Sequence, residues 1–336
     1  MRFSFPCRFL LIFSPLLLAI FITSQSTASQ FIKCRDKNGN DIFTDDQQQC
    51  TVNGKPTQPA VELASNRTAA SLTFTVSYKD PQGLIKNKTL YAENIKAAGK
   101  AWEQHLAGSA TIEILVQVVH DNMGRHSAHS KRSYYVRTIA GKRIYEQGVA
   151  FEIRTGIDPN GAEPDLIITT DRKALDGMWL DEEPYQRLKP VAVGKIDSMS
   201  VFIHELGHAL AFSGWLNINT QSSTENVNYS TYDNNIRFVN GNPYFTGPFA
   251  EAVYGGSVPL AFKSNSYAHI GDADKHRGHA LENTIMNGIA FYYSRRYNIT
   301  PLDLAIMHDS GVALNSSSLA FIKRAFHKNA SVTATE

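Results

Sequence analysis

The sequence predicts an α/β (α+β) fold built on a mixed, twisted sheet. From about residue 71 onward, segments with the alternating pattern of strands are interleaved with segments that have the 3.6-residue period of helices. The chain has 336 residues, of which 43% are hydrophobic and 19% are charged, as is typical of a soluble globular protein with a sizeable core. We therefore expect one large domain at residues 71–325, with a mostly helical and irregular C-terminal part and a short polar tail at 326–336.

The first 28 residues have the pattern of a removable export signal. Arg2 and Arg8 flank a short basic region, Phe9–Ile22 is an apolar core, and small residues follow up to a cleavage point near Ala28. A membrane anchor is the alternative, but the apolar core is short for a bilayer span and contains Pro15. The sequence thus predicts an exported, periplasmic or extracellular protein with no transmembrane segment in the mature chain.

Removal of this signal leaves a nearly neutral protein. The formal net charge is +2, and Arg2 and Arg8 account for the excess. A chain with balanced charge lacks the basic surface that nucleic-acid binding requires. We therefore expect no nucleic-acid partner.

Residues 29–55 are expected to form a small β-hairpin module. Asn38-Gly39 lies between two runs that carry apolar residues, which is a strong hairpin signal. Cys7 leaves with the signal, so Cys34 and Cys50 remain as an even pair, and a disulfide between them is expected in an exported protein. Two free thiols are the alternative. The polar residues 56–70 read as a linker.

This module resembles a small domain of unknown function that occurs near the N-terminus of many bacterial envelope proteins. The match covers roughly twenty residues and rests on Phe31, Cys34, Asp36, Gly39, Phe43, Thr44 and Asp45. The resemblance implies a bacterial source and an envelope location.

The large domain is expected to contain alternating strands and helices, with one helix packed on the sheet and a His-rich helix beneath it. The expected elements are strands at 72–80, 110–119, 134–139, 149–154 and 165–169, an amphipathic helix at 91–106, and the His-rich helix at 198–212. A basic surface loop at 124–133 carries His126 and His129, and His120 precedes it. The strand at 110–119 is expected to be the sheet edge that binds an extended substrate.

The His-rich helix carries half of a zinc site. His204 and His208 are four residues apart, so both imidazoles lie on one face of a helix, and Glu205 lies one step round. Two histidines that satisfy hydrogen bonds in the core are the alternative, but the glutamate and the apolar flanks favour zinc. Gly207 lets a neighbouring segment approach closely. A catalytic zinc has three protein ligands and an open position, so one ligand is missing.

The third ligand does not follow the helix directly. In the compact metzincin pattern a glycine and a histidine come three and six residues after the second histidine, and here these positions are Ala211 and Gly214. The compact pattern is therefore excluded.

Residues 245–288 resemble the corresponding stretch of leishmanolysin-like metzincins and their bacterial relatives, in which a long insertion precedes the third histidine. The resemblance implies that His269, 61 residues after His208, is the third ligand, and that Met286 in a Met-turn forms an apolar floor under the metal. It also implies one zinc ion per chain.

The resemblance extends through residues 299–311, a helix-and-stop segment similar to the one that closes these domains. Thr300 can cap this helix, Pro301 suits its first turn, Asp303 can complete a capping box and Gly311 can end it.

Two features depart from the family pattern. Ala211 replaces the glycine at which the chain normally turns, so the turn is expected at Ser213-Gly214. The tyrosine that some metzincins have after the methionine is missing, because Tyr292 and Tyr293 come too late.

Other ligands remain open. His276 and His279, or Glu251 and Glu282 in a glutamate-liganded site, could replace His269. The loop with Asp158, Asn160 and Asp165 could bind calcium, but its spacing fits no known calcium loop, and a plain turn is favoured.

The predicted function is zinc-dependent hydrolysis of peptide bonds in a protein or peptide substrate. An open zinc site lowers the pKa of its bound water to about 7, and Glu205 would act as general base. One alternative is a non-catalytic envelope binding protein whose structural zinc is closed by a fourth ligand such as His276. Another is a zinc amidase that acts on cell-wall material.

Overall fold

The structure is a computed structural model that describes most of the chain from residue 30 onward. The described residues are 30–35, 41–44, 51–52, 55–56, 60–62, 70–223, 227–261, 267–271, 281–288, 291 and 293–333. The predicted export signal at 1–28 lies outside this part of the chain. Within the described part, no helix has both the length and the apolar character needed to cross a membrane.

A four-stranded mixed sheet forms the base of the large domain. The strands follow the order β6 (Ser71–Lys79), β7 (Ser109–Val119), β11 (Leu166–Asp171) and β8 (His126–Ser130). β6, β7 and β11 are parallel, and β8 is antiparallel to β11. Helices combined with a mixed sheet agree with the expected α/β class.

The prediction that 110–119 is an edge strand is wrong. β7 is hydrogen-bonded to β6 on one side and to β11 on the other, so its backbone has no free edge. β8 borders the sheet instead, in the segment expected to be a basic surface loop. His129 on this strand is exposed, whereas the ring nitrogens of His126 are buried. Polar composition concealed this strand, because an edge strand needs few apolar residues.

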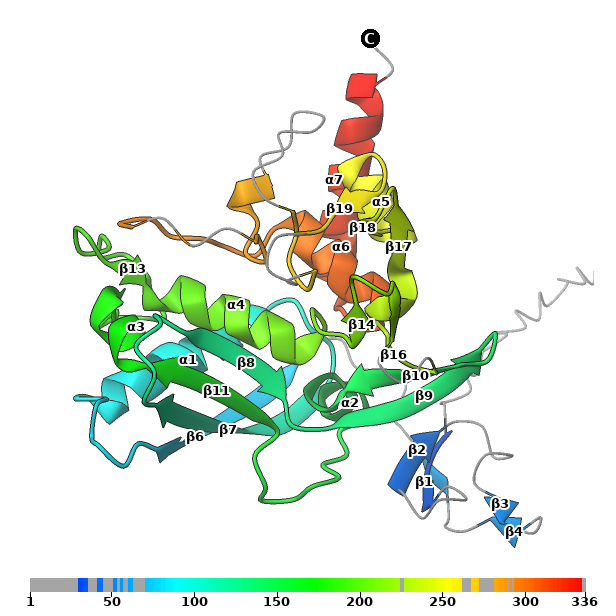
Figure 1. Cartoon of the computed structure of the whole chain (residues 1–336), viewed down its shortest axis with the longest axis horizontal. Helices are drawn as coiled ribbons and strands as arrows, with labels where there is room; N and C mark the ends of the chain where they lie inside the picture. Colours follow the sequence, from blue (N-terminus) through cyan, green and yellow to red (C-terminus); the bar gives the residue numbers. More distant parts are fainter. Residues whose placement is uncertain are drawn as a thin grey trace, which may run out of the picture.

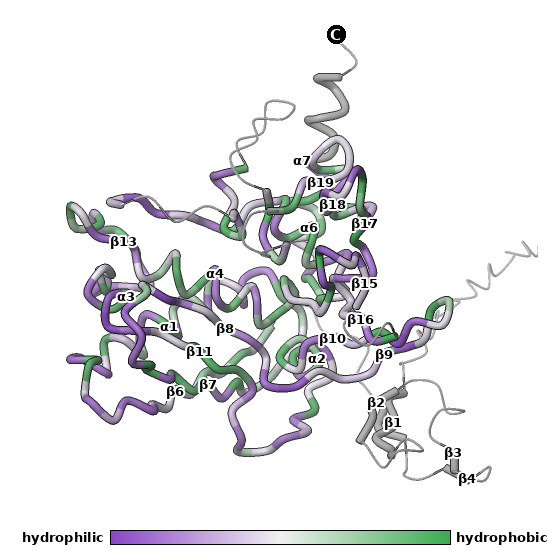
Figure 2. The backbone as a smooth tube through the Cα atoms, in the orientation of Figure 1, coloured by the Kyte–Doolittle hydropathy of each residue, from purple (hydrophilic) through white to green (hydrophobic). Residues whose placement is uncertain are grey.

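Three helices cover one face of the sheet. They are α1 (Lys88–Glu103), α2 (Gly148–Thr155) and α4 (Ser198–Leu210) (Figure 1). Alternate residues of β7, such as Ile112 and Ile114, are buried beneath them. The indole N–H of Trp102 on α1 donates to the carbonyl of Ile203 on α4 at 2.8 Å, which fixes the two helices together. Figure 2 shows hydrophobic segments along the central strands and a hydrophilic loop between α2 and β11.

Residues 149–154 form a helix, although a strand was expected. Val149, Ala150 and Ile153 pack in the main hydrophobic core, whereas Phe151 packs against Tyr134 in a second cluster, and Gly156 ends α2 in the left-handed conformation at φ +67°. A run of six residues, four apolar and two charged, does not distinguish the two periods, so the tertiary contacts of α2 decided its conformation.

Asp197 fixes the start of the His-rich helix. Its carboxylate accepts the backbone N–H of Ser200 at 3.1 Å as the N-cap of α4. Arg187 binds the same buried carboxylate at 3.1 Å, and Arg296 lies 3.5 Å from it. α4 therefore begins at a position fixed by two cations.

The remainder of the large domain consists of short strands and helices. Beside α2, β9 (Ser133–Ile139), β10 (Lys142–Gln147) and β16 (Asn228–Ser230) form one sheet. The other elements before α6 are α3 (Arg172–Gly177), β12 (Met178–Trp179), β13 (Ile196–Asp197), β14 (Leu216–Asn217), β15 (Ser222–Ser223), η2 (Asp233–Asn235), β17 (Ile236–Val239), β18 (Asn242–Phe245), α5 (Pro248–Tyr254), β19 (Val258–Pro259) and η5 (Leu281–Asn283).

Two helices end the described chain. α6 (Pro301–Asp309) has the expected capping box of Thr300 and Asp303, and Gly311 follows it at φ +88°. α7 (Ser316–Thr333) continues past residue 326, where the polar tail was expected to begin.

The N-terminal module contains the expected hairpin. β1 (Gln30–Arg35) pairs with β2 (Asp41–Thr44) in antiparallel fashion, and Cys34 lies on β1. The span expected to be a linker includes β5 (Ala60–Glu62), which pairs with β1, and β3 (Thr51–Val52) pairs with β4 (Lys55–Pro56). Cys50 lies outside the described residues, so the disulfide remains a prediction.

Candidate functional site

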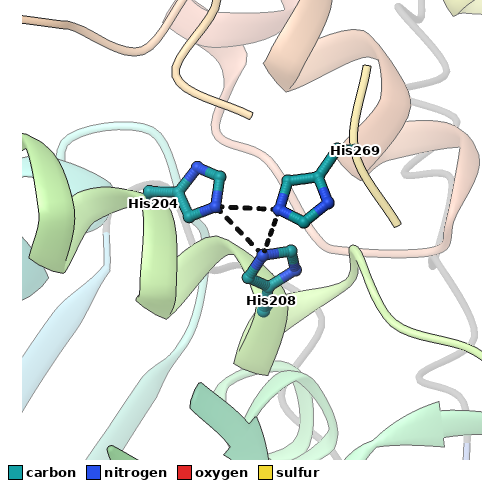
Figure 3. A group of neighbouring side chains, drawn as sticks. All are labelled: His204, His208 and His269. Atoms are coloured by element: carbon teal, nitrogen blue, oxygen red, sulfur yellow. Dashed lines mark hydrogen bonds between the residues drawn. The ribbon is translucent and has the colours of Figure 1, made fainter. Parts of the chain in front are cut away.

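Three histidine side chains meet beside α4, on the side of the helix that faces the C-terminal part of the domain. Figure 3 shows His204 and His208 on α4 and His269 on a segment from the C-terminal part of the domain. Their Nε2 atoms form a triangle in which each pair is separated by 3.1 Å. Tertiary folding thus brings together the three residues that the sequence predicts as metal ligands.

Backbone carbonyls orient two of these rings. Nδ1 of His204 lies 2.7 Å from the carbonyl oxygen of Ile285, and Nδ1 of His208 lies 2.7 Å from that of Phe212. A carbonyl can only accept, so both Nδ1 atoms carry the proton, and both Nε2 atoms present a lone pair. Two lone pairs 3.1 Å apart cannot hydrogen-bond to each other, so a cation between the rings would relieve their repulsion.

The donor set fits a zinc ion. Four tetrahedral nitrogen ligands at the usual Zn–N distance of 2.0–2.1 Å are about 3.3–3.4 Å apart, close to the measured 3.1 Å. Hydrogen bonds from Nδ1 to carbonyls are the usual support for histidine ligands to a metal. Among the described residues, no fourth histidine, cysteine or carboxylate joins this group.

Burial keeps the two helix histidines neutral. Both are only 9% exposed, and burial followed by the neighbouring His269 lowers the pKa of His204 to about 3. The same two causes, in the same order, hold the pKa of His208 well below its ordinary value. Neutral imidazoles are the form that binds a metal.

Glu205 lies on the same helix but not in the ligand group. Its side chain is 4% exposed, and Oε2 has no hydrogen-bond partner among the described residues. Burial raises the pKa of this carboxyl to about 8, and the backbone N–H of Ala128 on β8 lowers it. A cation on the adjacent imidazoles would favour the charged form. The Glu205 carboxylate, with one oxygen that has no partner among the described residues, can accept a proton.

The predicted Met-turn packs against α4. Met286 is fully buried, and its Sδ lies 2.4 Å from the place where a Cβ on Gly207 would be. Any side chain at position 207 would force Met286 to move, which favours glycine between the two histidines. The Met286 carbonyl also accepts the backbone N–H of Ile270 at 2.7 Å, so the turn is bonded to the residue after His269.

Asp303 anchors the Met-turn, a role that sequence reasoning missed. Besides completing the capping box of α6, its carboxylate accepts the backbone N–H groups of Ile285 and Met286, each at 3.1 Å. Ile285 is also the residue whose carbonyl orients His204. The capping pattern was visible in the sequence, but the contact with the turn 17 residues earlier was not.

Asp233 connects the segments that follow His208 and precede His269. Its buried carboxylate accepts the backbone N–H of Trp215 at 2.9 Å and the hydroxyl of Tyr267 at 3.0 Å. It therefore ties the turn after α4 to the segment that carries His269. Gly214 is needed there, because a Cβ would lie 2.0 Å from Oδ1 of Asp233.

An aromatic residue borders the site. The ring centroid of Phe291 lies 5.3 Å from that of His204 and 4.5 Å from that of Tyr297. Tyr293 is 64% exposed, and Tyr292 lies outside the described residues. Phe291 thus provides an apolar wall that the sequence analysis did not identify.

The two glutamates that were considered as alternative ligands lie outside the histidine group. Oε1 of Glu251 accepts a hydrogen bond from Ser257 at 2.7 Å, and neither Glu251 nor Glu282 belongs to the histidine group. His276 and His279 lie outside the described residues.

Comparison with known proteins finds no matching family model, no matching curated protein and no matching solved structure.

Proposed function

We propose that this protein is an exported, bacterial, zinc-dependent endopeptidase that resembles the leishmanolysin-like metzincins. The observation that carries the proposal is the triangle of three Nε2 atoms, each 3.1 Å from the others, with the buried carboxylate of Glu205 on the same helix. The close contact of Met286 with Gly207 supports the resemblance, because an apolar Met-turn under the metal is part of that family's pattern.

In this proposal, His204, His208 and His269 hold the zinc ion, and Glu205 moves protons. Zinc held by three imidazoles lowers the pKa of a water in its open position and polarises a nearby carbonyl group. The Glu205 carboxylate accepts a proton from the water that attacks the peptide carbonyl, and it then gives a proton to the amine nitrogen as the C–N bond breaks. The Phe291 ring, edge-on to that of His204 at 5.3 Å, would shield this imidazole from bulk water.

An extended substrate would bind along β8. This strand borders the sheet and pairs with β11 on one side, so its other edge can pair with a peptide. The Ala128 N–H on the same strand faces Glu205, which brings that edge close to the proposed general base.

The test is a conservative substitution of the general base. Glu205→Gln keeps the size of the side chain and removes the proton acceptor, so peptide hydrolysis should fall by about 10²–10⁴-fold while the zinc content stays at one per chain. Glu182→Gln, at a position with a 72% exposed side chain, is the matched control and should retain full activity. The readouts are cleavage of a mixed peptide library, with and without chelator, and elemental analysis.

The outcomes separate the alternative functions. Wild-type protein that binds zinc but cleaves no peptide in the library would favour the non-catalytic binding protein. Chelator-sensitive release of amines from cell-wall material, without peptide cleavage, would favour the amidase. A Glu205→Gln protein that cleaves peptides at the wild-type rate would refute the assigned role of Glu205.

A further inference from the structure

A second group of possible metal ligands lies away from the three histidines. One carboxylate oxygen each from Glu152 on α2, Asp158 in the following loop and Asp165 just before β11 lies within 4.8 Å of the other two. This loop joins α2 to β11 below the sheet in the view of Figure 1. Its spacing alone predicted a plain turn, because one of the two buried carboxylates, that of Glu152, comes from the preceding helix rather than from the loop.

Hydrogen bonds position the carboxylates of the loop. Oδ1 of Asp158 accepts the backbone N–H groups of Asn160 at 3.0 Å and Gly161 at 2.7 Å. Asp165 accepts the side-chain amide of Asn160 at 3.0 Å and the backbone N–H of Glu113 on β7 at 2.8 Å. The loop therefore holds both aspartates toward α2.

The buried carboxylate of Glu152 indicates that this group can bind a cation. It is 2% exposed, and among the described residues its Oε2 has no hydrogen-bond partner. Lys131 and Arg132 are close to the loop, but they form their ion pairs with the exposed Glu163, each at 3.0 Å. A buried carboxylate without a partner is unfavourable unless it is protonated or binds a cation.

The surrounding acids increase this cost. Burial, followed by the negative charge of Asp165, raises the pKa of Glu152 to about 9. Burial, followed by its contact with Asp165, raises the pKa of Glu113 to about 7. Like charges that cannot all ionise together are stabilised by a bound cation.

We propose that Glu152, Asp158 and Asp165 bind one calcium ion, which links α2 to the start of β11 and is separate from the histidine centre. All donors are oxygens, which favours a hard cation over zinc. Two oxygen ligands of one Ca²⁺ can lie up to about 5 Å apart, so the three oxygens can share one ion. Calcium accepts irregular coordination by carboxylates, whereas magnesium requires a near-ideal octahedron.

The proposal predicts stabilisation that depends on calcium. In the zinc-loaded mature protein, 10 mM CaCl₂ should raise the melting temperature by about 3–10 °C over calcium-free buffer, as expected at 10 to 100 times the dissociation constant. The same concentration of MgCl₂ controls for ionic strength and should give a much smaller rise.

Variants test which residues bind the ion. Glu152→Gln should abolish the shift and, without calcium, melt at or near the wild-type temperature, because glutamine matches the size of the protonated acid and, like it, carries no charge. Glu163→Gln, in the same loop but exposed and paired with Lys131 and Arg132, should retain the shift. Asp158→Asn is the second ligand variant, and because Asp158 is exposed it should fold even if Glu152→Gln does not.

Calorimetric titration of the zinc-loaded wild type should give one calcium ion per chain. The same number in His208→Ala would show that the calcium site is separate from the zinc centre. Equal shifts with calcium and magnesium, no shift with calcium, or an undiminished shift in Asp158→Asn or Glu152→Gln would each overturn the proposal.

Discussion

Asp303→Asn should weaken both the fold and the zinc site, because one carboxylate supports both. Asp303 is fully buried. Oδ1 accepts the N–H of Met286 at 3.1 Å, and Oδ2 accepts those of Ile285 at 3.1 Å and Thr300 at 2.8 Å. Asparagine has almost the same shape but only one acceptor oxygen.

The size of the effect follows from these bonds. The least costly orientation keeps the oxygen at the Oδ2 position and turns the NH₂ group toward the Met286 N–H, which loses its acceptor at a cost of about 1–3 kcal/mol. The bonds that remain lose the assistance of a charge. We expect the free energy of unfolding to fall by about 2–4 kcal/mol in total. Zinc affinity should fall about 10–100-fold, because the turn whose Ile285 carbonyl orients His204 is displaced.

Denaturant unfolding of the zinc-free protein and competition with a chelator of known affinity measure the two effects separately. Thr300→Ala is the matched control. It removes the N-cap of the same helix at a cost of about 1 kcal/mol and leaves the bonds from Asp303 to the Met-turn in place. The reasoning fails if Asp303→Asn binds zinc as tightly as wild type, or if Thr300→Ala weakens zinc binding to the same extent.

Three further predictions concern other positions. His269→Ala should retain the fold but lose the zinc seen by elemental analysis. Wild-type zinc content in this variant would indicate that His276, His279 or Glu251 is the third ligand instead. Gly207→Ala should lower the free energy of unfolding by about 1–3 kcal/mol and weaken zinc binding, because its Cβ would lie 2.4 Å from Sδ of Met286. Helix propensity alone predicts that alanine stabilises the helix, so a more stable variant would contradict this packing. Burial lowers the pKa of His126 from 6.5 to about 4. Between pH 6.5 and pH 4 the unfolded state therefore binds more protons than the folded state, and up to about 3 kcal/mol of stability is lost as the pH falls through this range. Melting curves of His126→Gln should therefore depend less on pH in this window than those of wild type, and equal slopes would show that His126 is not the cause.

The failures of the sequence analysis share a physical origin. Residues 149–154 are too few to distinguish the strand period from the helix period, and burial of Val149 and Ile153 against the sheet settled the matter. The strand β8 was missed because it lies at the edge of the sheet, where polar residues are tolerated. The central position of β7 was missed because the pairing of parallel strands depends on their distant neighbours.

The sequence by itself determined the features that depend on residues a few positions apart. The shared face of His204 and His208 and the capping box of Thr300 and Asp303 follow from the geometry of a single helix turn. Resemblance to a family was needed to reach His269, because nothing local connects residues 61 positions apart. Tertiary structure alone decided that Asp303 holds the Met-turn, that Asp233 joins the turn after α4 to the His269 segment, and that Glu152 faces the aspartates of the next loop. These contacts join segments that meet only when the core closes, and a buried carboxylate takes its partners from whichever backbone the packing brings near.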